Sequence, residues 1–142
     1  NENNFVQLLI DKIEKDQITH RQKFAEIEEK LKSELEKIEE LKLILESAEL
    51  DKEIDIYNQN LNKFNLEVNE FNIHYENQLN NLKNTILENL LIILKKYSSD
   101  NKIELILDSK SYILASNSIN ITEIILTDLN KIDLKIRFEK FE

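Results

Sequence analysis

The sequence of 142 residues contains no glycine, proline, cysteine, methionine or tryptophan. Of these absences, that of glycine excludes the largest number of protein classes. Phosphate-binding loops, dinucleotide-binding turns and nucleophile elbows need a residue that tolerates positive φ or a close backbone approach, so enzymes built on these motifs are excluded. Without cysteine there is neither a disulfide framework nor a thiolate nucleophile, which fits an oxidising compartment as well as a reducing one.

Composition and charge narrow the class of protein further. Charged residues make up 33% and hydrophobic residues 41%, and no run approaches the ~20 apolar residues of a membrane-spanning helix, which predicts a soluble protein. The 28 acidic and 19 basic residues give a net charge of -9, so we predict no nucleic-acid partner, because phosphate binding needs clustered Lys and Arg. Since the chain lacks methionine and begins at Asn1, we expect a leader or more to have been removed or left out.

Residues 1–99 have the periodicity of two amphipathic helices. Apolar residues recur at steps of three and four, which places them on one helix face, and the second half has the heptad spacing of a coiled coil. The predicted hairpin seam comprises Leu31, Ile38, Leu45, Leu61, Phe64, Val68, Phe71 and Tyr75. Each half needs a surface against which to bury its seam, so we predict a long antiparallel helical hairpin. Its turn is expected near residues 46–53, where Ser47 or Asp51 could cap the second helix.

Two polar residues interrupt the first seam. Extended backwards from Phe24, the seam reaches His20, Gln17 and Ile13. Either these polar groups form a wet layer that lets the hairpin flex, or Ile18 takes over the seam and leaves His20 exposed. His20 and His74 have no His or Cys partner four positions away, so we predict no metal site and no cofactor.

A second apolar stripe flanks the seam. Leu66, Ile73, Leu87 and Leu94 lie off the seam at multiples of seven residues. The stripe is either the shoulder of a wide helix interface or an apolar surface left open for a partner.

Residues 100–142 show a different pattern. In "KIELILD" and "YILAS" apolar residues alternate, "SKS" between them is a plausible turn, and Asn120 with Glu123 resembles a capping box that opens a helix. This predicts a strand–strand–helix module. An isolated hairpin of two strands is marginal in water, so we expect the module to pair with copies of itself. The alternating segment Ile132–Phe138 is either an added strand or an ordered tail.

The C-terminal block resembles the Skp/OmpH family of periplasmic chaperones. Ile103–Asp108 is similar to the family's I-D-L-V-L-D strand, and Asn120-Ile121-Thr122 to its D-I-T, which opens the terminal helix. The resemblance implies a mainly α homotrimer whose strands form a small β-barrel from which three helical hairpins project. It also implies an ATP-independent holdase in the periplasm that binds unfolded outer-membrane proteins and keeps them from aggregating.

The resemblance assigns roles to residues of this protein. The oligomerisation core would comprise Ile103, Leu105, Leu107, Tyr112, Leu114, Ile121, Ile125 and Leu129. The expected client-facing positions are Leu66, Ile73 and Leu87. The family begins with a strand, and Asn1–Phe5 show no strand pattern, so whether a strand precedes Asn1 stays open. Contact with a membrane surface or lipopolysaccharide also stays open, because the best-known members are basic whereas this protein has a net charge of -9.

Two other classes of protein fit the pattern. One is a structural coiled-coil stalk or scaffold subunit with a small C-terminal assembly domain. The other is a prefoldin-like chaperone, whose strands lie between its helices. We do not predict an enzyme, because no catalytic constellation is visible.

Overall fold

The computed structural model describes residues 4–142, and all that follows concerns these residues. It consists of the long helices α1 (Asn4–Leu41) and α2 (Ser47–Asn101), two short 3-10 helices (Ser109–Ser111 and Asn117–Ile119) and the helix α3 (Thr122–Leu129). The protein forms two compact units. One contains Leu9–Asn77 and Phe138–Glu142, and the other contains Gln78–Arg137 with the stretch up to Leu8.

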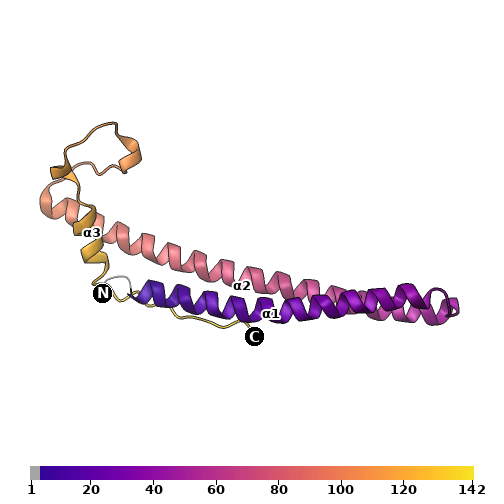
Figure 1. Ribbon diagram of the computed structural model, residues 1–142. Coiled ribbons are helices and arrows are strands. Elements are labelled where there is room, and N and C mark those ends of the chain that lie inside the picture. The colour runs from indigo at the N-terminus through magenta and orange to yellow at the C-terminus, as the bar shows by residue number, and fades with distance from the viewer. Residues whose placement is uncertain (1–3) are drawn as a thin grey trace. The chain divides into compact units, whose positions relative to one another are not determined.

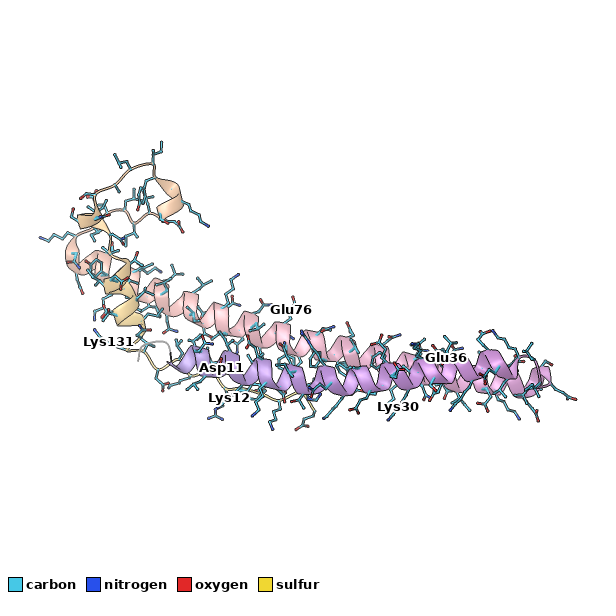
Figure 2. The ribbon with its side chains drawn as sticks, in the orientation of Figure 1. Asp11, Lys12, Lys30, Glu36, Glu76 and Lys131 are labelled. Atoms are coloured by element: carbon cyan, nitrogen blue, oxygen red, sulfur yellow. The ribbon has the colours of Figure 1, made fainter. Side chains whose placement is uncertain are left out.

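In the first unit α1 and α2 form an antiparallel hairpin (Figure 1). The connection, residues 42–46, lies just before the turn region expected from the sequence, and Leu45 N–H bonds to Leu41 C=O at 2.9 Å. Further along the hairpin, Asn60 donates to Glu34 across the two helices at 3.3 Å. Charged side chains such as those of Lys30 and Glu36 lie on the outside (Figure 2).

The hairpin buries a single stripe of apolar side chains. Its buried members are Leu9, Ile13, Phe24, Leu31, Ile38, Phe71 and Tyr75. Burial of a large apolar side chain contributes roughly 1.5–3 kcal/mol, so this stripe is the main source of stability of the hairpin. No helix of the described residues is at once long enough and apolar enough to cross a lipid bilayer.

The second unit has a small core of Leu82, Ile93, Ile125 and Leu134. Here α2 ends in a Schellman motif. Ile103 N–H bonds to Ser98 C=O at 2.9 Å, Lys102 N–H bonds to Ser99 C=O at 3.4 Å, and Lys102 has φ of 55°. This position usually holds glycine, and a lysine here costs about 1 kcal/mol or more. Lys102 is the one residue with positive φ among residues 4–142.

The predicted fold class is wrong in its C-terminal part. No strand is present in the described residues, and so neither a strand–strand module nor a small β-barrel, and residues 103–108 have no regular secondary structure. The cause lies in the last residue of each alternating stretch. Asp108 Oδ1 accepts from Lys110 N–H at 2.8 Å, and Ser116 Oγ accepts from Ser118 N–H at 3.3 Å. These bonds begin 3-10 turns and compete with a strand ladder.

The helix predicted after Asn120 is present as α3, but its N-cap is Ile121 and has no side-chain cap bond, so the predicted capping box of Asn120 and Glu123 is wrong. The Asn120 side chain accepts a hydrogen bond from Thr122 N–H at 3.0 Å at the start of the helix. Residues 132–142, which include the alternating segment Ile132–Phe138, have no regular secondary structure. The sequence showed no strand pattern over Asn1–Phe5. The first three of these residues lie outside the described part of the protein.

Candidate functional site

The carboxylate of Asp16 is the polar centre of the hairpin unit. Its Oδ2 accepts hydrogen bonds from the Tyr75 hydroxyl and from Phe141 N–H, the latter at 3.3 Å. His20, one turn further along α1, places its Nε2 3.9 Å from the same oxygen. The side chains of His20 and Asp16 are only 12% and 14% exposed. One carboxylate oxygen therefore joins α1, α2 and the segment 138–142, which we call the closing segment.

Aromatic rings surround this carboxylate. Phe71 lies at the centre, with ring centroids 5.1 Å from Phe24, 5.0 Å from Tyr75 and 5.5 Å from Phe141, each in edge-to-face geometry. Phe141 also meets His20 edge-to-face at 5.3 Å. Edge-to-face pairs of this kind contribute about 0.5–1.5 kcal/mol beyond the burial of their area. The rings thus hold the closing segment in place as well as filling the hairpin.

The backbone of the closing segment is bound a second time. His74 Nε2 lies 2.9 Å from the Glu139 carbonyl oxygen, and because a carbonyl only accepts, the imidazole donates in this bond. The His74 ring also packs on Phe141, with centroids 5.6 Å apart. Both histidines of the sequence therefore belong to this site.

The site shifts the pKa values of its two acidic groups. Burial raises the pKa of Asp16, but the hydrogen bonds from Tyr75 and Phe141 and the charges of His20 and Lys140 outweigh it, and the net pKa lies below the ordinary 3.8. Burial together with the bond to Asp16 raises the pKa of Tyr75 above its usual 10.0. Tyr75 therefore keeps its proton and donates in this bond, and Asp16 stays ionised and accepts.

The arrangement is suited to binding an extended polypeptide. It offers an acceptor for a backbone amide, a donor for a backbone carbonyl, and an aromatic surface between them. No group of three or more His, Cys, Asp or Glu among the described residues is placed to hold a metal ion. Elsewhere, Glu26, Glu29, Lys30 and Ser33 line an open depression on α1, and their charged groups face solvent.

The structure also answers the question raised by the polar residues of the first seam. Ile18 is 57% exposed, so the alternative in which it takes over the seam is wrong. His20 lies in the seam and is largely covered by aromatic rings.

The sequence predicted three groups of residues: the hairpin seam, the client-facing positions and the oligomerisation core. Of the seam residues, Leu31, Ile38, Phe71 and Tyr75 are buried, and Leu45, Leu61, Phe64 and Val68 are half-buried. The proposed client-facing residues Leu66, Ile73 and Leu87 are exposed.

The proposed oligomerisation core is divided between the inside and the surface of its unit. Ile125 is buried, and Ile103, Ile121 and Leu129 are half-buried. The exposed members are Leu105, Leu107, Tyr112 and Leu114.

Sequence reasoning missed Asp16 and Phe141. They are 125 positions apart, so no local spacing relates them. The available signal was indirect: polar residues interrupting one seam, and an aromatic residue in a charged segment that belonged to no predicted helix.

No protein-family model, curated protein or solved structure matches this sequence.

Proposed function

We propose that the protein is an ATP-independent holdase chaperone that binds unfolded outer-membrane proteins in the periplasm and keeps them from aggregating. The observation that carries the proposal is the exposed apolar stretch between Ile103 and Ile119. Leu114 is 91% exposed and Ile113 is fully exposed. No backbone–backbone hydrogen bond joins residues 104–107 to another described segment. Exposed apolar surface of this kind is typical of a protein-binding site.

An irregular apolar stretch suits clients that have no fixed shape. An unfolded polypeptide presents apolar side chains in no defined arrangement, so a binder must form many weak contacts without demanding a single complementary shape. The exposed residues of the stretch supply such contacts: Leu105, Leu107, Tyr112, Ile113, Leu114 and Ile119.

The distribution of charge also supports a holdase. Residues 9–77 carry 18 acidic and 10 basic residues, whereas residues 78–137 carry 7 acidic and 8 basic residues. The apolar stretch therefore lies in a nearly neutral part of the sequence, and the negative charge lies on the hairpin. Like charge on each complex opposes association between complexes, which keeps a loaded holdase in solution. The trimer built around a β-barrel is not part of the proposal, because the described residues form no strand.

An aggregation assay tests the proposal. A denatured outer-membrane protein is diluted out of urea with and without the purified holdase, in the absence of nucleotide, and light scattering is followed. We expect a near-stoichiometric amount of the holdase to suppress scattering. The double variant Ile113→Ser with Leu114→Ser should lose most of this effect.

The matched control places the same two changes elsewhere. Leu43 and Ile44, in the connection between α1 and α2, are also strongly exposed, and Leu43→Ser with Ile44→Ser should leave suppression unchanged. Wild-type protein that fails to suppress scattering, or a 113/114 variant as active as wild type, would contradict the proposal.

A second candidate function is a structural stalk or scaffold subunit. It is favoured by α2, a single helix of 55 residues without interruption. A stalk would not suppress aggregation and would need a distinct partner protein for stability, so the same assay, with a melting curve of the isolated protein, separates the two functions.

A further inference from the structure

The closing segment is bound as a peptide ligand would be. Residues 138–142 have no regular secondary structure. They meet the hairpin through the Glu139 carbonyl on His74, Phe141 N–H on Asp16, and the Phe141 ring against Phe71 and His20. Two of these interactions use backbone groups that every polypeptide has, and the third needs only an aromatic ring.

The closing segment also carries a charged side chain near the site. Lys140, directly before Phe141, lies close enough to Asp16 for its charge to help lower the pKa of that carboxyl group. Lys140 is itself exposed, so its charge is screened by solvent and sets no requirement on the ligand.

The receiving surface does not depend on the closing segment for its own geometry. Tyr75 bonds to Asp16 within the hairpin, and Phe24 packs edge-to-face on both Phe64 and Phe71. These contacts join α1 to α2 directly. They would hold the surface in place when the closing segment leaves.

We propose that Asp16, His20, Phe71 and His74 form a binding site for an extended peptide that contains an aromatic residue, and that the protein's own residues 138–142 occupy it in cis. This site lies on other residues than the apolar stretch 103–119 and does not rest on the holdase function. A peptide in trans must compete with a tethered segment, whose effective concentration reaches about millimolar for short flexible linkers.

The two histidines allow a direct test, because the sequence has no others and both lie in the site. Imidazole proton signals are recorded at fixed pH for the full wild-type protein and for Phe141→Ala, which empties the ring position. We expect both signals to move in the variant. Adding the blocked peptide RFEKFE, the sequence of residues 137–142, should return them toward their wild-type positions.

Matched peptides define the ligand. RFEKAE, which lacks the ring, should leave the signals of the variant unmoved at the same concentrations. The wild-type protein should respond to RFEKFE only at much higher concentration than the variant.

Three outcomes would overturn the proposal. In the first, millimolar RFEKFE does not move the histidine signals of Phe141→Ala toward their wild-type positions, although circular dichroism shows that the variant is folded and helical. The second is an equal response to RFEKAE. The third is a wild-type protein that binds RFEKFE as tightly as the variant does, since its site would then not be occupied in cis. None of these measurements uses a client protein, so their outcome is independent of the aggregation assay.

Discussion

Tyr75 and Asp16, 59 positions apart, are joined by a hydrogen bond from the phenol to the carboxylate. Tyr75 is 2% exposed, and the carboxylate oxygen that it reaches also accepts Phe141 N–H. The bond therefore links the two helices of the hairpin at the point where the closing segment is attached.

Replacing Tyr75 by Phe removes this bond and keeps the ring. Hydrogen bonds to charged groups contribute about 1.5–3 kcal/mol, so we expect Tyr75→Phe to lower the free energy of unfolding by an amount in this range. Urea denaturation followed by circular dichroism measures it. Tyr57→Phe, on the same helix and outside the site, is the matched control and should change stability little. An equal loss in both variants would show that the bond to Asp16 is not the cause.

The lowered pKa of Asp16 predicts a dependence on acid pH. A carboxyl group whose pKa is lower in the folded state than in the unfolded state adds stability above the unfolded value, here about 3.8, and this stability is lost as the pH falls through the folded value. Asp16→Asn should therefore lose stability relative to wild type at about pH 7. The difference should shrink as the pH falls below about 4. A difference that stays constant down to about pH 2 would contradict the assignment.

Lys102 provides a test of backbone strain. Its φ of 55° suits glycine, so Lys102→Gly should raise the free energy of unfolding by about 1 kcal/mol. The control is Asp100→Gly, in the last turn of α2, which should lower it by about the same amount, because glycine is unfavourable inside a helix. Thermal or urea denaturation of the two variants compares them. Destabilisation by both changes would argue against a left-handed Lys102.

Phe71 is the ring on which the aromatic cluster depends. It is 3% exposed and touches rings from α1, α2 and the closing segment, so Phe71→Ala should cost about 3–5 kcal/mol. Leu66→Ala, at an exposed position of the same helix, should stay within about 0.5 kcal/mol of wild type. Both values come from urea denaturation. Similar losses at the two positions would mean that Leu66 is buried in solution against another molecule.

The helical part of the fold could be inferred from the sequence because its signal is local. Apolar residues at steps of three and four define a helix face within a few turns, and the absence of glycine and proline leaves the helices uninterrupted. The alternation in Ile103–Asp108 is also local, but a strand needs a partner strand, and alternation supplies none. Asp108 and Ser116 instead direct the backbone into short turns.

The candidate site could not be inferred in the same way. Its essential contact, Phe141 N–H to Asp16, joins residues that no periodicity relates. His20 and Gln17 marked the place as an interruption of the seam, yet an interruption does not show what covers it. The covering residue, Phe141, lies just beyond the alternating segment Ile132–Phe138, for which the sequence left both an added strand and an ordered tail open.

The closing segment also sets an order of events during synthesis. Phe141 follows Asp16 by 125 residues, so the hairpin of residues 9–77 leaves the ribosome well before the ring that completes its aromatic cluster. Until then His20, Phe71 and His74 lack one of their aromatic neighbours. Domains commonly fold as they are made, from the N-terminal end. In this protein the unit formed first is finished last, and the nascent hairpin carries an open aromatic surface for as long as the remaining residues are being translated.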